Sequence, residues 1–571
     1  GNQVVVLTLI DRADTFSGNA RLGRATNQSH REWIYRQAYE LGRHVIGYEV
    51  QKVLAAVDWF TRENTKRTAL PIAVHGYGEG GLIALYAGAL DPRIETTRVR
   101  GYFGPREGVW EEPIYRNVFG QLREFGDAEI ARLIVPRRLV VEAMDAPEIA
   151  GPPEPRPRFA GAAPGRIVTP AIESVRSEVE RARRLAGPWS DAIQLVEPAP
   201  ETSRDDPRVG RLAEASLPEA ARRQERQVRE LERFTQRRLQ LSASVRDDFF
   251  WKKVPPITPE AWRSAMMPYR EKFWSEIIGR VPAAGTPLNP RSRPLLDRPT
   301  WTAHEVVLDV APEIFAWGYL LLPKGMKPGE KRPVVVVQHG LEGVPADVIN
   351  DDQSSRAWRP YKAFGARLVE RGFIVFAPHN PYRGEDKFRM LQRKANPLGL
   401  SLFSFIIAQH ERILDWLGTL PQVDAARIGF YGLSYGGKAA MRVPAVLERY
   451  ALSICSGDFN EWIFKNATTE WPGSYMFTKE WEMFDFDLGS TFNYAEMAAL
   501  IAPRPFMVER GHDDGVGSDE WVAFEYAKVN RLYAKLKIPL RTTIEYFNGP
   551  HTIHGVGTFK FLHQHLNWPE P

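Results

Sequence analysis

The chain has 571 residues, a formal net charge of +5 at pH 7 and 43% hydrophobic residues. This length predicts about two to four domains with sizeable cores, and the small net charge argues against a nucleic-acid-binding protein. No run of about eighteen apolar residues occurs, so we expect no membrane-spanning helix. A single cysteine, Cys455, excludes an intrachain disulfide.

The first 200 residues contain segments typical of strands and turns. Strands are expected at 1–6 and 192–198, and a glycine-rich turn lies between them at 76–81. Residues 151–165 are rich in Pro, Gly and Ala, which predicts a loop. Residues 133–138 precede a further strand candidate.

Two helical segments follow. Ser216 to Glu219 has the spacing of a capping box, which predicts a helix running toward Leu241. Its arginines at 222–238 are interleaved with glutamates, as on a solvated helix face. A second helix is expected at 259–278. We expect this second helix to pack under the second domain, and the first helix to be a structural bridge, with a partner-binding helix as the alternative.

The second half alternates strands and helices, which indicates a parallel sheet built from βαβ units. An apolar run ends at Gln338 and enters the loop His339-Gly340-Leu341-Glu342-Gly343. The further candidates are a helix at 361–371, a strand at 372–378, a helix at 405–420 and a strand at 427–431.

That last strand runs into Gly432-Leu433-Ser434-Tyr435-Gly436. In a nucleophile elbow, a sharp strand-to-helix turn exposes the serine Oγ at the carboxyl edge of the sheet. Ser434 is therefore the candidate nucleophile, and an ordinary glycine-rich turn is the alternative. The backbone N–H groups of Leu341 and Tyr435 are the candidate oxyanion donors.

The acid and the base should follow the serine in that order. Asp514 is the first candidate for the acid and Asp513 the second, while Glu509 is expected to point from its strand into a polar interior. His551 is preferred to His554 as base because it follows its strand within a short loop. His512, Asp513 and Asp514 could instead bind a metal, but no spaced ligand set accompanies them.

From about Asp309 to Leu566 the chain resembles the dienelactone-hydrolase and acetyl-xylan-esterase branch of the α/β-hydrolases. The resemblance lies in His339-Gly340, Pro381-Tyr382-Arg383-Gly384, the Gly-Leu-Ser-Tyr-Gly-Gly elbow, Ala502-Pro503-Arg504-Pro505 and Gly549-Pro550-His551. It implies doubly wound, mostly parallel sheets with helices on both faces, and a serine esterase without metal or cofactor.

Lys438 is similar to a lysine that the glucuronoyl esterases carry four residues after the serine. Tyr435 stands where those esterases have an arginine. Lys438 and Arg383 are therefore candidate substrate-binding residues.

The first half is similar to a degraded copy of the second. Gly76-Tyr77-Gly78-Glu79-Gly80-Gly81 matches the elbow, and Gly78 takes the place of the nucleophile. No histidine follows the strand at 192–198, so this copy is expected to be inactive. Glu79 as a replacement nucleophile is an unfavoured alternative.

The expected domains are an inactive copy at 1–200 that lacks its N-terminal part, a helical bridge at 201–290 and a catalytic domain at 291–571. In this alignment Gly1 falls inside the sheet, so we expect a longer natural protein with a segment upstream of Gly1. A secretory signal in that segment would make the protein secreted or periplasmic.

An insertion at 456–490 is rich in aromatic residues and is expected to lie over the cleft. Trp462, Trp471 and Trp481 are its candidate substrate-binding residues, since aromatic faces suit sugar rings or aryl acids.

The sequence thus predicts a serine esterase acting on a small or polysaccharide ester, of the acetyl-xylan or glucuronoyl type. It predicts no nucleic-acid or membrane partner, and it leaves a homo-oligomer open. A prolyl-oligopeptidase-like serine peptidase and a binding or scaffold protein with a vestigial site are the alternatives.

Overall fold

The computed structural model describes all residues except 1–2, 66–69, 157–160, 198–218, 255–257 and 283–284. The chain divides into two compact units. The first unit comprises 1–240, 396–399 and 467–486, and the second unit comprises 241–395, 400–466 and 487–571. Part of the expected aromatic insertion, 467–486, therefore belongs to the first unit rather than to the unit that carries Ser434.

The second unit contains a nine-stranded sheet in the order β15-β14-β13-β12-β10-β11-β9-β8-β7. From β11 through to β15 neighbouring strands are parallel, whereas β9 runs antiparallel to both of its neighbours. The strands are β7 (Arg291–Asp297), β8 (Trp301–Ala311), β9 (Ile314–Pro323), β10 (Arg332–Gln338), β11 (Ile374–Pro378), β12 (Val423–Leu433), β13 (Leu452–Ser456), β14 (Phe506–Gly511) and β15 (Thr542–Phe547).

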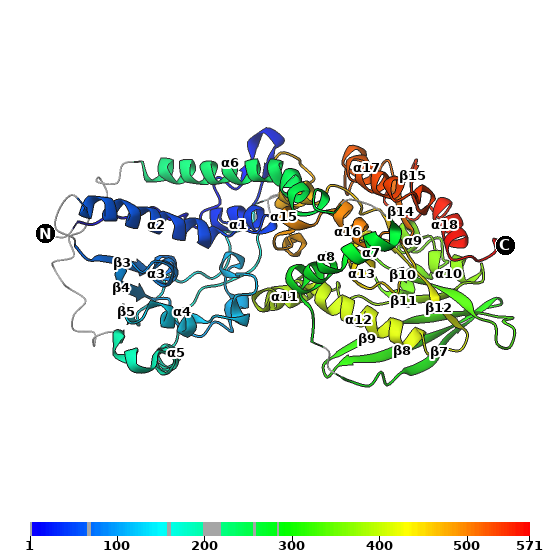
Figure 1. The fold of residues 1–571 in the computed structure, drawn as a ribbon, viewed down its shortest axis with the longest axis horizontal. Helices are drawn as coiled ribbons and strands as arrows, with labels where there is room; N and C mark the ends of the chain where they lie inside the picture. The colour runs from blue at the N-terminus through cyan, green and yellow to red at the C-terminus, as the bar shows by residue number, and fades with distance from the viewer. Residues whose placement is uncertain (1–2, 66–69, 157–160, 198–218, 255–257, 283–284) are drawn as a thin grey trace. The chain divides into compact units, whose positions relative to one another are not determined.

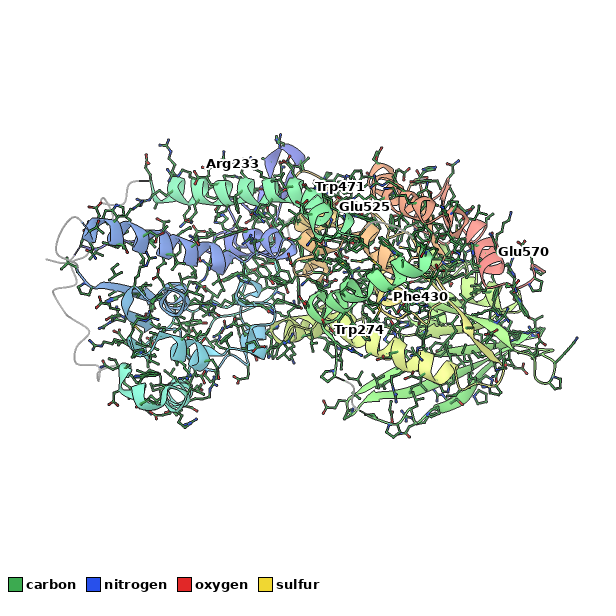
Figure 2. The ribbon with its side chains drawn as sticks, in the orientation of Figure 1. Arg233, Trp274, Phe430, Trp471, Glu525 and Glu570 are labelled. Atoms are coloured by element: carbon green, nitrogen blue, oxygen red, sulfur yellow. The ribbon has the colours of Figure 1, made fainter. Side chains whose placement is uncertain are left out.

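Helices cover both faces of this sheet. Successive side chains of a strand point to opposite faces, so neighbouring residues of one strand contact different helices. Tyr431 of β12 contacts Phe364 of α10 (Phe364–Val369), with ring centroids 5.1 Å apart. The preceding residue, Phe430, contacts His410 of α12 (Leu402–Leu417) at 5.4 Å and is fully buried. Phe430 is labelled in Figure 2. This accounts for the continuous apolar runs of the central strands.

The remaining helices of the second unit agree with the expected alternation. The predicted helix at 361–371 is split into α9 (Trp358–Tyr361) and α10, and the one at 259–278 is split into α7 (Pro259–Ala265), α8 (Met267–Lys272) and the π-helical segment Phe273–Gly279. The others are α11 (Asp386–Ala395), α13 (Tyr435–Val446), α14 (Trp462–Ala467), α15 (Leu488–Thr491), α16 (Tyr494–Ile501), α17 (Asp519–Lys535) and α18 (Gly557–His565).

The first unit contains a parallel four-stranded sheet in the order β3-β4-β5-β6 (Figure 1). Its strands are β3 (Ile72–Tyr77), β4 (Ile94–Arg100), β5 (Arg138–Glu142) and β6 (Ile193–Val196). Its helices are α1 (His30–Glu40), α2 (Val45–Asn64), α3 (Glu79–Leu90), α4 (Asp127–Ile134) and α5 (Ile172–Ala186), and a short hairpin joins β1 (Gly18–Asn19) to β2 (Arg24–Ala25). The predicted α/β architecture with mostly parallel sheets is confirmed.

The prediction of a strand at 1–6 is wrong for residues 3–6, the part of it that the structure describes. Residues 3–10 form no strand. The Ile10 backbone N–H instead donates to the Glu49 carboxylate of α2 at 2.8 Å. In the second unit the matching strand, β11, is held between β10 and β9. Among the described residues of the first unit, β3 pairs only with β4. The apolar residues 3–6 therefore have no strand to pair with in the described part of this sheet.

The first of the boundaries between the units falls within α6 (Ala220–Arg246). This is the helix predicted to run toward Leu241, although its expected capping residues 216–218 lie outside the described part. Within the described ranges, no helix is both long and apolar enough to span a bilayer.

Candidate active site

The candidate nucleophile Ser434 lies between the end of β12 and the start of α13. Its backbone has φ 61° and ψ −125°, a strained conformation for a residue with a side chain. A Cβ added at Gly432 would lie 2.1 Å from the Gly436 carbonyl oxygen, and one at Gly436 would lie 2.3 Å from the Gln338 carbonyl oxygen. Both positions therefore need glycine, which is the physical reason for the sequence pattern.

The candidate base and acid form a hydrogen-bonded pair. The His551 Nδ1 atom lies 2.8 Å from the Asp514 Oδ2 atom, and the second carboxylate oxygen accepts from the Val516 backbone N–H at 2.9 Å. Asp514 is 3% exposed, whereas Asp513 is exposed. The structure thus brings Asp514, rather than Asp513, to the imidazole.

Glycine contacts place this pair beside Ser434. The Ser434 backbone N–H donates to the Ser456 carbonyl at the end of β13, at 2.9 Å. A Cβ on the next residue, Gly457, would lie 2.9 Å from His551 Cε1 and 3.0 Å from a Leu433 methyl group. The imidazole therefore lies close to the carboxyl end of β13, next to the strand whose end carries the half-buried Ser434.

The loop after β10 closes the other side of Ser434. A Cβ on Gly340 would lie 3.1 Å from the Ser434 Cβ, and the Gly340 N–H donates to the Tyr361 hydroxyl at 2.8 Å. The next backbone N–H, that of Leu341, has no acceptor among the residues that the structure describes. Tyr435 is the first residue of α13, where backbone N–H groups have no partner within the helix.

The histidine of this loop is a structural group. Burial lowers the pKa of His339 to about 3, so the ring is neutral. It stacks on His379 at 5.4 Å, and the Tyr382 hydroxyl donates to its carbonyl oxygen. Arg383 is exposed beside this pair, and its charge also lowers the pKa of both histidines.

Other candidates near the pair have different partners. Glu509 is buried and accepts from the Ser456 hydroxyl at 2.6 Å and the Tyr431 hydroxyl at 2.9 Å, and burial raises its pKa. It lies in the polar interior that the sequence suggested. His554 Nδ1 lies 3.1 Å from Glu545, and His512 Nδ1 lies 2.6 Å from Asp519.

Asp458 is a neighbour that sequence reasoning missed. It follows β13 directly and is buried, and burial raises its pKa to about 6 although Tyr494, Lys438, Arg442 and His551 all lower it. The Tyr494 hydroxyl donates to Asp458 Oδ2 at 2.5 Å. Its position after a strand, like that of Asp514, was the available signal.

Three of the proposed substrate contacts lie away from solvent. Lys438 is 1% exposed, and its ammonium lies 4.9 Å from the ring centre of Trp462, which is itself fully buried. Trp481 is 4% exposed and belongs to the first unit, as does the partly exposed Trp471. The insertion expected to lie over the cleft is thus divided between the units, since 467–486 belongs to the first unit.

The first unit has a strand-to-helix turn at Gly78 with a backbone conformation similar to that of Ser434. Gly78 has φ 56° and ψ −116°, close to the values of Ser434. A Cβ at Gly78 would lie 2.5 Å from a side-chain carbon of Pro147, so a serine there would clash. The next residue, Glu79, is held by Arg116 at 2.6 Å and by Arg12 at 3.2 Å. These ion pairs hold the Glu79 carboxylate in place, which is the role of a structural residue.

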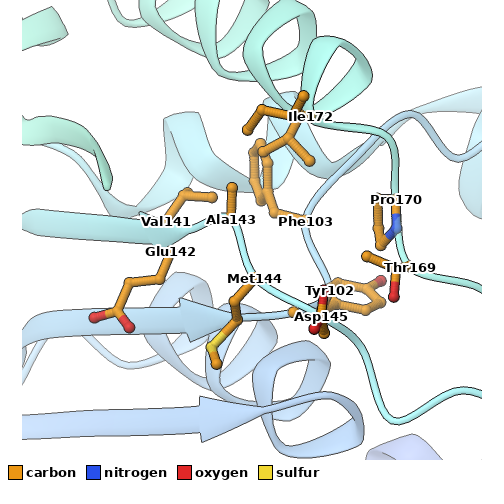
Figure 3. Close-up of a pocket in the computed structure, with 12 residues that line it drawn as sticks. Tyr102, Phe103, Val141, Glu142, Ala143, Met144, Asp145, Thr169, Pro170 and Ile172 are labelled. Atoms are coloured by element: carbon orange, nitrogen blue, oxygen red, sulfur yellow. The ribbon is translucent and has the colours of Figure 1, made fainter. Parts of the chain in front are cut away.

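A cavity of about 180 Å³ lies elsewhere in the first unit, at the carboxyl ends of β4 and β5 (Figure 3). Phe103, Val141, Ala143 and Ile172 give it an apolar wall. It is separate from Ser434 and its partners, which all belong to the second unit.

The strand order, the antiparallel β9 and the elbow together define the fold. The second unit is an α/β-hydrolase fold. No protein-family model matches the chain. Solved structures similar to it include an acetyl xylan esterase from Bacteroides fragilis, described as putative, at 18% identity and TM-score 0.41, over 54% of this chain and 81% of that one.

Two further similar structures are glucuronoyl esterases. The one from Solibacter usitatus has 15% identity and TM-score 0.41, over 55% of this chain and 95% of that one. The one from Teredinibacter turnerae has 19% identity and TM-score 0.40, over 54% of this chain and 86% of that one.

Proposed function

We propose that the protein is a serine carboxylic-ester hydrolase that works through an acyl-enzyme on Ser434. The observation that carries this proposal is the His551–Asp514 hydrogen bond, which lies at the edge of the sheet where β12 ends in the elbow serine. A serine hydroxyl needs a positioned base to become nucleophilic, and the base needs a carboxylate to fix its tautomer.

Each residue then has a role in the reaction. His551 takes the Ser434 proton as Oγ attacks the ester carbonyl, and it returns that proton to the departing alcohol. Asp514 holds His551 and stabilises the imidazolium. The N–H groups of Leu341 and Tyr435 donate to the oxyanion. Water then attacks the acyl-enzyme by the same route and releases the acid.

We further propose that the ester is carbohydrate-linked, of the acetyl-xylan or glucuronoyl type. One support is that the motifs around Ser434 and His551 resemble those of the acetyl-xylan-esterase branch of the α/β-hydrolases. A second is Arg383, whose exposed guanidinium lies beside the loop after β10. A guanidinium there can donate to sugar hydroxyls or pair with a uronate.

Each part of the chain has its own place in this proposal. Residues 291–571 would be catalytic, and 1–200 would be a silent copy whose elbow is closed by Pro147. The segment 201–290 would join them.

A substrate panel tests the function. Acetylated xylan, a glucuronoyl ester, a feruloylated sugar and a short nitrophenyl acetate should be compared with a peptide, using Ser434→Ala as the blank. We expect hydrolysis of at least one sugar ester in preference to the peptide. Cleavage of the peptide alone would replace the esterase proposal with the serine-peptidase alternative.

A further inference from the structure

One face of the sheet in the first unit carries a cluster of charged side chains, here called the arginine face. Strand register and alternation place the following side chains on it: Ala73, His75 and Tyr77 of β3, Thr96, Arg98 and Arg100 of β4, Arg138, Val140 and Glu142 of β5, and Gln194 and Val196 of β6. Parallel sheets usually bury both faces under helices and carry apolar side chains on both. This face is an exception.

The opposite face of the same sheet follows the usual rule. A Cβ on Gly88 of α3 would lie 2.1 Å from the Thr97 hydroxyl oxygen, so α3 packs directly on that side of β4. Val175 of α5 lines the cavity together with Val141 of β5. Helices α3 and α5 therefore cover the face that carries Thr97 and Val141.

The second unit shows what normally occupies the other face. Most of its matching side chains are apolar and belong to one buried cluster with α10 and α18, which includes Tyr431, Ile454 and Met507. At the carboxyl ends of β13 and β14 the matching side chains are the polar Ser456 and Glu509. When Gly78 is aligned with Ser434, His75 falls at Tyr431, and the strand registers then place Arg98 at Ile454. At this position the first unit thus has an arginine where the second unit has a buried apolar side chain.

The arginine face is accessible and has an excess of positive charge. The side chains of Arg98 and Arg100 are 35% and 47% exposed, and both pair with Glu142, Arg100 at 2.5 Å. Arg138 is exposed and donates to the Gln194 side chain at 2.7 Å, a neutral partner. Among the described side chains that strand register places on this face, three arginines stand against one carboxylate, an excess of two positive charges.

We propose that the arginine face binds a polysaccharide that carries carboxylate groups, that is, a polymer containing uronic acid. Guanidinium groups form bidentate hydrogen bonds with carboxylates. Neighbouring strands lie about 4.8 Å apart and alternate residues of a strand about 7 Å apart, so the arginines form a flat row that an extended polymer can follow. Tyr77 is 47% exposed at the end of this row and offers a ring to a sugar face.

The choice of a sugar polymer, rather than another polyanion, rests on the proposed carbohydrate-esterase function. Binding itself is measured independently of that function. The full chain carrying Ser434→Ala should be titrated with polygalacturonate, with a methyl-esterified sample of the same polymer as the neutral control and single-stranded DNA as the competing polyanion. We expect binding to the acidic polymer that weakens with salt, and little binding to the neutral one.

Arg138 provides the sharpest variant because its hydrogen-bond partner on this face is uncharged. Arg138→Gln should raise the Kd for polygalacturonate about threefold to fivefold, the range expected for one exposed ion contact. Arg138→Glu should raise it about tenfold or more, for two units of charge. The matched control is Arg132→Gln on α4, which removes an exposed arginine that donates to the Leu185 carbonyl and should leave the Kd unchanged.

Several results would overturn the proposal. These are equal binding of the neutral polymer, binding of DNA as tight as that of polygalacturonate, and equal effects of the Arg138 and Arg132 variants. Hydrolysis of nitrophenyl acetate by the Arg138 variants, in the Ser434 background, reports that the chain is folded. If no ester is hydrolysed but polygalacturonate still binds through Arg138, the proposed function fails and the binding surface stands.

Discussion

The exchange of Asp514 for asparagine is the most specific test of the site geometry. Asp514 Oδ2 lies 2.8 Å from His551 Nδ1, and the carboxylate is 3% exposed. Asparagine keeps the size of the side chain and removes its charge. It also leaves an amide that can hold the imidazole in the wrong tautomer.

The size of the effect follows from that distance. Opposite unit charges 2.8 Å apart interact by about 6 kcal/mol at an effective dielectric constant of 20. A loss of about 5.5 kcal/mol of transition-state stabilisation corresponds to about four orders of magnitude in rate. We therefore expect Asp514→Asn to lower kcat by roughly three to four orders of magnitude. Arg510 lies 3.6 Å from Asp514 but also pairs with Asp519 at 3.0 Å, so the substitution does not leave it unpaired.

The assay is steady-state hydrolysis of a nitrophenyl ester, with the melting temperature as a folding check. Asp513→Asn is the matched control, since it makes the same change one residue away on an exposed side chain. It should alter kcat by no more than about twofold, as surface substitutions do. A larger loss from Asp513→Asn would transfer the role to Asp513. No loss from either would refute the geometry and direct attention to Asp458.

Three further outcomes are expected. Asp458→Asn should slow hydrolysis at neutral pH, because the imidazolium that forms at His551 during the reaction loses a nearby carboxylate; an unchanged kcat/KM would remove Asp458 from the site. Lys438→Ala should slow a sugar ester and nitrophenyl acetate alike, since the ammonium is enclosed by aromatic rings; a rise in KM for the sugar ester alone would restore its substrate role. Glu79→Gln should destabilise the first unit by about 3 kcal/mol. Despite burial, Arg116, Arg31 and Arg12 lower the pKa of Glu79 from 4.5 to about 2, so this stabilisation is complete above pH 4.5 and is lost as the pH falls toward 2. A wild-type advantage in melting temperature that grows below pH 4.5 would contradict the assignment.

The parts of the fold that sequence predicted are those with a local physical cause. Gly432 and Gly436 are dictated by backbone contacts near 2 Å, so the elbow is visible as a motif. The central strands are apolar throughout because helices cover both faces of the sheet. The order of Ser434, Asp514 and His551 follows from the order of the strands that carry them.

The parts that sequence did not predict depend on contacts distant in the chain. The aromatic run 456–490 has no periodicity that shows where 467–486 packs, and the structure assigns it to the first unit. The strand expected at 1–6 depended on neighbouring strands rather than on its own apolar residues. The arginine face becomes visible only once strand register places β3, β4 and β5 side by side.

The central claim is that Ser434 is a nucleophile activated by His551, and covalent labelling tests it most directly. The intact protein should be treated with a fluorophosphonate and the modified peptide identified by mass spectrometry. The account predicts one adduct, on Ser434, that disappears in Ser434→Ala and forms much more slowly in Asp514→Asn. An unlabelled Ser434 in the folded protein, or an adduct on another serine of a chain that still hydrolyses esters, would contradict it.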